Sequence, residues 1–302
     1  MHRLLLTSAL LLISLCDRPK PSGPPVFDGA RAYDLLVQQC GFGPRTPGSA
    51  GHRAALDFLT VELGKWADSV EEDPFTYRDA KVDTVVSLTN VKGVFNAQAA
   101  ERILLCAHWD TRPYADQDPD PAKRNQPILG ANDGASGVAV LLEVARVLRQ
   151  IPPVKGADIV FFDGEDYGRG IGGDVSDYFL GARRFAAVNK GKYAPRMGIL
   201  LDMIGDRDLT IYYEGYSNRT YPDHVARVWQ AAAALGYRQF IPQQKYFIQD
   251  DHIPLMEAGI PCIDLIDFDY PPWHTVADTP DRCSPQGLKA VGDVVLKVVY
   301  EL

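Results

Sequence analysis

Acidic and histidine side chains recur in this chain beside short apolar runs, and their types suit metal chemistry. The clusters are His108-Trp109-Asp110, Gly130-Ala131-Asn132-Asp133, Asp163-Gly164-Glu165-Asp166, Leu201-Asp202 and Trp273-His274-Thr275. Carboxylate and imidazole groups are the ligands that zinc takes when it keeps an open catalytic position. A structural zinc site would be expected to use paired cysteines, and the sequence contains no Cys-x-x-Cys motif. The clusters therefore predict a catalytic metal site.

The first two clusters each have a simpler interpretation when taken alone. His108 could be a histidine with a hydrogen-bonding role at a strand end, with Asp110 holding its tautomer or orienting a neighbour. Asp133 lies in a glycine-rich turn directly before a predicted helix. There, Asp133 or Ser136 could simply cap the helix.

The later acids are harder to explain without a partner. Glu165 and Asp166 could be solvated loop residues, but adjacent acids at a buried strand end need a cation or a raised pKa. Asp202 lies between apolar residues, where an unpaired carboxylate is costly, so pairing or metal binding is favoured. Asp251 could cap a short helix that begins at His252.

Short apolar runs alternate with segments of helical spacing along most of the chain. Strands are expected over 82–95, 103–107, 159–162, 199–201 and 260–266, and helices over 30–40, 51–66, 136–148, 178–188, 224–235 and 286–300. This order predicts an α/β fold, a three-layer α/β/α sandwich with a central, mainly parallel mixed sheet. In such a sheet the site lies at the carboxyl ends of the strands, which is where the clusters fall.

Length and charge narrow the class of protein. A chain of 302 residues can bury one large core, and we expect a single catalytic domain over 29–302. The net charge of −8 and the absence of a basic run argue against nucleic acid as a partner. We expect a monomer.

The N-terminal residues predict export. Residues 1–16 have a short cationic start and an apolar run too short to span a membrane, as in a signal peptide. Cys16 stands where a lipoprotein signal carries its lipidated cysteine, so the protein is expected to be periplasmic, anchored to a membrane by lipid, or secreted. Residues 17–28 read as a proline-rich flexible tether. Cys40, Cys106, Cys262 and Cys283 could form disulfides in an exported domain. Cys106 and Cys262 lie in apolar runs, where a buried free thiol is the more common state.

The ordered clusters resemble those of the zinc-dependent aminopeptidases with a two-metal site. Within that superfamily the chain is more similar to the glutaminyl cyclases, over roughly residue 42 to the C-terminus. The motifs that carry this resemblance are PRTPGS (44–49), FFDGED (161–166), LLDMIGD (200–206), IQDDHIPL (248–255) and WHT (273–275). The aminopeptidases usually show Ser-Asp-His and a tyrosine before the last ligand, whereas this chain has Asp250 before Asp251-His252 and Trp273 before His274.

The resemblance implies a role for individual residues. Asp133, Asp166 and His274 would hold one zinc ion, with Asp166 standing where many cyclases have glutamate. Glu165 would be the general acid/base. Asp202 and Asp250 would form an acidic hydrogen-bonded pair that tunes Glu165. Aromatic and amide side chains would contact the substrate, namely those of Trp273, Tyr270 and Gln249. A pocket tryptophan of animal cyclases has no counterpart in 167–173.

The resemblance also implies the reaction, in which the N-terminal glutamine of a peptide or protein is cyclised to pyroglutamate and ammonia is released. An aminopeptidase remains the alternative, because His108, Asp202 and a bridging Asp133 could hold a second metal ion. A binding protein without activity is disfavoured, since no candidate ligand or base is missing from the sequence.

Overall fold

A mixed six-stranded sheet forms the centre of the molecule. The computed structural model describes residues 26–170 and 175–302. Within these ranges the strand order is β1-β2-β4-β3-β5-β8. The strands are β1 (Ser69–Asp79), β2 (Thr84–Phe95), β3 (Arg102–His108), β4 (Gly156–Phe162), β5 (Met197–Asp202) and β8 (Ile263–Ile266). β4, β3, β5 and β8 are mutually parallel, whereas β1 and β2 add an antiparallel edge.

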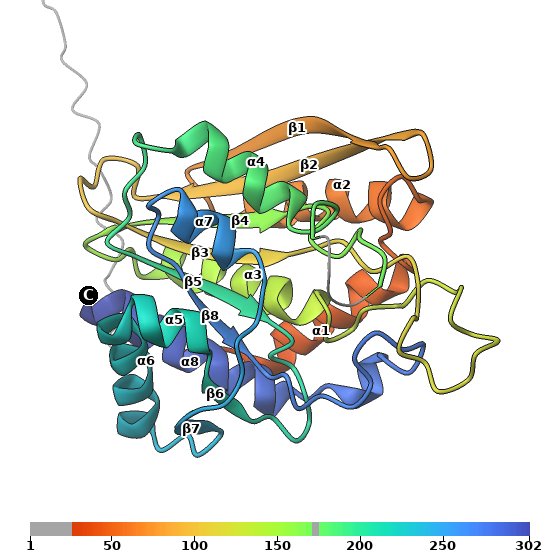
Figure 1. Cartoon of the computed structure of the whole chain (residues 1–302). Helices are drawn as coiled ribbons and strands as arrows, with labels where there is room; N and C mark the ends of the chain where they lie inside the picture. The colour runs from red at the N-terminus through yellow and green to blue at the C-terminus, as the bar shows by residue number, and fades with distance from the viewer. Residues whose placement is uncertain (1–25, 171–174) are drawn as a thin grey trace, which may run out of the picture.

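Helices cover both faces of the sheet (Figure 1). One layer contains α1 (Gly29–Gly41), α2 (Ala50–Gly64), α3 (Ala135–Gln150), α6 (Pro222–Leu235) and α8 (Pro285–Glu301). The opposite face carries α4 (Leu180–Asn189) and α7 (His252–Glu257). The smaller elements are α5 (Gly215–Thr220), the 3₁₀ turn η1 (Pro280–Arg282), and a separate parallel pair, β6 (Ile211–Tyr213) with β7 (Phe240–Gln244). The predicted three-layer α/β/α sandwich is confirmed.

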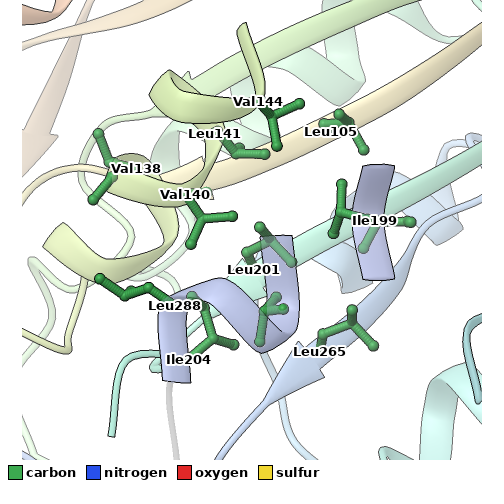
Figure 2. Close-up of a cluster of buried hydrophobic side chains, with 14 of the residues drawn as sticks. Leu105, Val138, Val140, Leu141, Val144, Ile199, Leu201, Ile204, Leu265 and Leu288 are labelled. Atoms are coloured by element: carbon green, nitrogen blue, oxygen red, sulfur yellow. The ribbon is translucent and has the colours of Figure 1, made fainter. Parts of the chain in front are cut away.

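Alternating side chains of the central strands build two apolar cores. Leu105, Ile199, Leu201 and Leu265 point to the layer of α3 and α8, as Figure 2 shows. Their neighbours Leu104 and Cys106 point to the opposite face, against α4 and α7. Because both faces are covered, the central strands are apolar along nearly their whole length, which is why they read as continuous apolar runs.

The structure corrects several element boundaries. β1 was not expected, since its polar, half-exposed sequence shows no clear apolar alternation at this edge of the sheet. β8 begins at Ile263, later than the predicted 260, because its pairing with β5 starts where Ile263 lies opposite Ile199. The helices expected over 136–148 and 286–300 are confirmed, each within two residues.

The chain is already part of the domain before residue 29. Phe27 is only 1% exposed, and its ring packs directly against Gly292 of α8. A Cβ at that position would lie 2.2 Å from the ring. Asp28 caps α1 by accepting hydrogen bonds from Ala30 N and Arg31 N. The tether predicted over 17–28 therefore ends before Phe27. The predicted signal peptide, Cys16 and the tether up to 25 lie outside the described residues.

Two further observations concern the chain as a whole. Among the described helices, none is both long and apolar enough to cross a membrane. Cys40, Cys106, Cys262 and Cys283 are all buried free thiols, as expected for Cys106 and Cys262.

Candidate active site

The predicted site residues meet at one edge of the sheet because the parallel strands end there. His108 is the last residue of β3, and Asp202 is the last residue of β5. Glu165 and Asp166 follow β4 by a few residues, while His274 follows β8 in a loop. Asp133 lies just before α3 and reaches the same edge. Strand-end placement inferred from the sequence is thus confirmed in three dimensions.

Two buried groups of possible metal ligands share Asp133. One group is Asp133, Asp166 and His274, and the other is His108, Asp133 and Asp202; in each group the ligand atoms lie within 4.8 Å of one another. Nε2 of His274 lies 3.6 Å from Asp133 Oδ2 and 3.5 Å from Asp166 Oδ1. Nε2 of His108 lies 3.2 Å from Asp133 Oδ1 and 3.1 Å from Asp202 Oδ1.

Asp133 is not a helix cap. The residue at the N-cap position of α3 is Gly134, and no side chain caps this helix. Instead, Asp278 holds the turn from outside by accepting hydrogen bonds from Asn132 N (2.9 Å) and Asp133 N (3.1 Å). The Asp133 carboxylate is therefore free to face the two histidines.

Asp110 orients the pair of acids after β4. Its two carboxylate oxygens accept hydrogen bonds from Glu165 N at 3.0 Å and Asp166 N at 3.2 Å. Its contact with His108 Nδ1 is longer, at 3.6 Å. Of the two roles considered for Asp110, the structure thus favours orienting a neighbour.

Arg112 is a buried residue of the site that the sequence did not reveal. Its guanidinium donates hydrogen bonds to Asp166 Oδ1, to both oxygens of Asp116 and to the Tyr178 hydroxyl. Asp116 in turn lies 3.6 Å from Nδ1 of His274. Arg112 therefore links two candidate ligands. Its position shortly after the His108-Trp109-Asp110 cluster was the only signal available in the sequence.

The donor set fits a bound cation. Oδ2 of Asp166 is buried and has no hydrogen-bond partner among the described residues, because Arg112 occupies only Oδ1. Burial, followed by the charge of Arg112, lowers the pKa of His274 to about 3, which keeps a nitrogen lone pair available. Burial raises the pKa of Asp166 well above its usual range. A divalent cation would relieve this cost of burying acids.

Glu165 has the environment of a general acid/base. Burial raises the pKa of its carboxyl, and the nearby charges of Asp166 and Asp250 raise it further, while His108 acts in the opposite direction. A carboxyl whose pKa is raised can both accept and return a proton near neutral pH.

One cavity of about 370 Å³ opens onto these groups. Its lining includes Glu165, Asp166, His274, Trp273 and Gln249. The indole of Trp273 stacks on His274 with ring centroids 3.9 Å apart. A larger hollow of about 690 Å³ lies between α1, α3 and α8, and none of the predicted site residues line it.

Tyr270, predicted to contact the substrate, does not line the cavity. It is 3% exposed, and its hydroxyl donates a hydrogen bond of 2.8 Å to Asp278. Tyr270 thus supports the Asp133 turn through Asp278. Phe268 and Trp273 line the cavity instead, and their rings pack on each other with centroids 4.9 Å apart. Tyr270 therefore lies behind the cavity wall.

The expected hydrogen bond between Asp202 and Asp250 is not formed. Asp202 is paired with His108, and Oδ2 of Asp250 has no hydrogen-bond partner among the described residues. Both acids line the cavity. Burial raises the pKa of Asp250 well above its usual range, and repulsion from Asp202 adds to this effect. The two acids therefore interact through charge across the cavity.

A second buried polar group lies behind Asp250. It contains Asp250, His252 and Asp264, with Nε2 of His252 lying 3.2 Å from Glu214 Oε2. Asp251 occupies the N-cap position of α7, but its side chain makes no cap hydrogen bond. Burial raises the pKa of Asp251 and of Asp264 well above the usual range, and the charge of Asp250 raises both further.

Solved structures of similar proteins share the fold of this chain. The chain has 38% identity to the solved structure of a glutaminyl cyclase from Bacteroides thetaiotaomicron, with a TM-score of 0.88, covering 93% of this chain and 100% of that one. A solved leucine aminopeptidase precursor from the same organism shows 39% identity and a TM-score of 0.89, covering 93% of this chain and 99% of that one.

A curated relative, the aminopeptidase YwaD of Bacillus subtilis, is 26% identical over 289 residues. This alignment covers 90% of the present chain but only 57% of the relative. The model of peptidase family M28 matches residues 90–299, which include every candidate ligand and Glu165. On this match, which covers more than half of the chain, and with the fold shared with these solved structures, the chain belongs to peptidase family M28.

Proposed function

We propose that this protein cyclises the N-terminal glutamine of peptides to pyroglutamate, with release of ammonia and with one zinc ion held by Asp133, Asp166 and His274. The observation that carries the proposal is the cavity itself. A flat aromatic wall, Trp273, stacks directly on a candidate ligand, and Glu165 lines the same 370 Å³ space. This volume is at the small end of ligand sites and suits a folded side chain.

Zinc, when bound, would polarise the side-chain amide carbonyl of the glutamine. Glu165 takes a proton from the attacking α-amine and returns it to the departing nitrogen. A bond forms between the α-nitrogen and the side-chain carbonyl carbon, the bond from that carbon to the amide nitrogen breaks, and ammonia leaves. Trp273 and Phe268 hold the side chain folded back on its own amine and limit access of water.

The contacts of the ligand groups support one ion. His108 and Asp202, which would hold a second ion, lie within hydrogen-bonding distance of each other at 3.1 Å. By contrast, Oδ2 of Asp166 is buried without such a partner among the described residues. The similarity to solved glutaminyl cyclases is further support.

Peptide-bond hydrolysis by an aminopeptidase is the second candidate. It is favoured by the group His108, Asp133 and Asp202, which could hold a second metal ion beside the first. It is also favoured by the similarity to a leucine aminopeptidase precursor. Glu165 would then activate a water molecule.

One experiment separates the two activities. The purified protein is incubated with a glutamine-leading and a leucine-leading peptide, and both masses are followed while metal per chain is measured. We expect ammonia loss from the first peptide, an intact second peptide and one zinc per chain. Release of free leucine with little ammonia loss, and two metal ions per chain, would assign the aminopeptidase instead.

We also propose that the protein is exported as a monomer and acts on peptide N-termini outside the cytoplasm. The support is the cationic and apolar start of the sequence, with a proline-rich segment after it. Mass spectrometry of protein from its native host would show loss of residues 1–15, with or without a lipid on Cys16. An intact, unmodified N-terminus would refute export by this route.

A further inference from the structure

We propose that Phe247 forms a subsite for the side chain of the second residue of the substrate and that it favours an aromatic side chain there. This inference rests on the proposed cyclase function, which places the N-terminal glutamine beside Glu165, His274 and Trp273. Phe247 lines the same cavity as Glu165 and His274, so the subsite is continuous with the reacting groups.

The exposure of the lining residues shows which end of the cavity is open. Phe179, Met203 and Ile266 are between 1% and 6% exposed, whereas Phe247 is 53% exposed. Among the described residues, Phe247 is the one exposed large hydrophobic side chain that lines this cavity. The second residue carries the rest of the peptide, so it lies toward the exposed part of the lining, which includes Phe247, Gln249 and Gly170.

The ring of Phe247 is held in place by residues of α5. A Cβ on Gly215 would lie 2.5 Å from Cδ1 of Phe247, so only glycine lets the ring approach this backbone. Tyr216 packs edge-on against the ring, with centroids 5.2 Å apart. The guanidinium of Arg219 lies 5.8 Å from the centre of the Phe247 ring. An exposed aromatic ring that is already ordered can bind a partner without a further loss of rotamer freedom.

The backbone beside the ring is also tied down. Gly215 N donates a hydrogen bond of 2.7 Å to Tyr246 O, and Ile248 N donates one of 3.0 Å to Glu214 Oε1. The residues on both sides of Phe247 are therefore fixed to the start of α5.

The surrounding chemistry selects the class of side chain. An aromatic side chain can pair with the exposed part of the Phe247 ring at ordinary stacking distances. An acidic side chain offers no ring for this pairing. A glycine has no side chain to pack on the Phe247 ring, which would stay exposed to solvent. The order of preference is therefore aromatic first, with glycine and acidic residues disfavoured.

The test compares glutaminyl-phenylalanine amide with glutaminyl-glycine amide by ammonia release. For the wild-type protein we expect a kcat/KM ratio of roughly threefold to tenfold in favour of the aromatic amide, mostly through KM. Phe247→Ala should bring this ratio close to one, whereas Phe247→Tyr, which keeps the ring, should retain it. Leu235→Ala removes another exposed apolar side chain, at the end of α6 and outside the cavity lining, and should leave the ratio as in the wild type.

The outcomes distinguish this inference from the function on which it rests. If both amides yield ammonia but the wild-type ratio is near one, or if Phe247→Ala keeps the wild-type ratio, the subsite is refuted while the cyclase function stands. If neither amide yields ammonia, the proposed function itself is wrong and the subsite falls with it. Circular dichroism of each variant confirms that the fold is intact.

Discussion

Glu214 anchors the wall of the cavity, and its charge should contribute measurably to the stability of the fold. Its carboxylate is buried and accepts hydrogen bonds from Tyr216 N (2.8 Å), Ser217 N (2.7 Å) and Ile248 N (3.0 Å). It also lies 3.2 Å from Nε2 of His252. Glu214 thus joins α5, α7 and the segment that carries Phe247.

The magnitude follows from the pKa of this carboxyl. Burial alone would raise it, but the interaction with His252 and the hydrogen bonds from Ser217 and Tyr216 outweigh burial and lower the pKa from 4.5 to about 2. A shift of that size corresponds to about 3 kcal/mol of stability from the ionised form. Because the folded-state pKa is depressed, this contribution is fully present above pH 4.5 and is lost as the pH falls toward 2.

The perturbation is Glu214→Gln, which keeps the shape of the side chain and removes its charge. Urea unfolding at several pH values should show a loss of about 3 kcal/mol at pH 7 relative to the wild type. The difference should stay constant down to about pH 5 and shrink below pH 4.5. Glu257→Gln, at an exposed position in the same region, is the matched control and should change stability by less than about 0.5 kcal/mol. A Glu214→Gln variant as stable as the wild type at pH 7, or a difference independent of pH, would refute this reasoning.

Three other predictions concern the metal and its neighbours. Glu165→Gln should keep its zinc, measured by elemental analysis, but lose roughly a hundredfold or more in turnover, because the proton acceptor is gone; loss of zinc in this variant, with retention in Asp166→Asn, would reverse the two assigned roles. Removal of zinc with a chelator should abolish activity and lower the melting temperature, and added zinc should restore both; full activity after exhaustive chelation would contradict the metal site. Arg112→Met should destabilise the fold by roughly 3–5 kcal/mol in urea unfolding, because Asp166 loses a buried partner. Arg112→Lys keeps the charge without the planar guanidinium, so its free energy of unfolding should lie between those of Arg112→Met and the wild type. Equal stability of Arg112→Met and the wild type would show that the guanidinium is not needed.

The positions of the chemical groups along the chain could be predicted because they depend on local patterns. His108, Glu165 and Asp202 each follow a run of apolar residues, and such runs mark buried strands. Parallel strands of one sheet bring their carboxyl ends to one edge, so side chains at those ends must meet even when they are far apart in sequence. These local patterns were enough to predict the central sheet and the edge of it that carries the site.

The partners of those groups could not be predicted in the same way. Arg112 and Asp278 touch the site through loops, and a loop carries no periodic signal that states what it will face. The resemblance to the glutaminyl cyclases implied that Tyr270 contacts the substrate, yet its side chain turns to Asp278 behind the wall. The exposed ring of Phe247 reaches the mouth of the cavity only because Gly215 leaves room for it.

The sequence by itself determined which residues can do chemistry and at which edge of the sheet they gather, since strand ends and apolar runs are properties of neighbouring residues. Only the tertiary structure decided how each group is held, which oxygen of Asp166 Arg112 contacts, and which aromatic rings form the wall. The physical reason is that a hydrogen bond or a ring contact depends on distances of a few ångströms between segments distant in sequence, and those distances are set by packing of the whole domain.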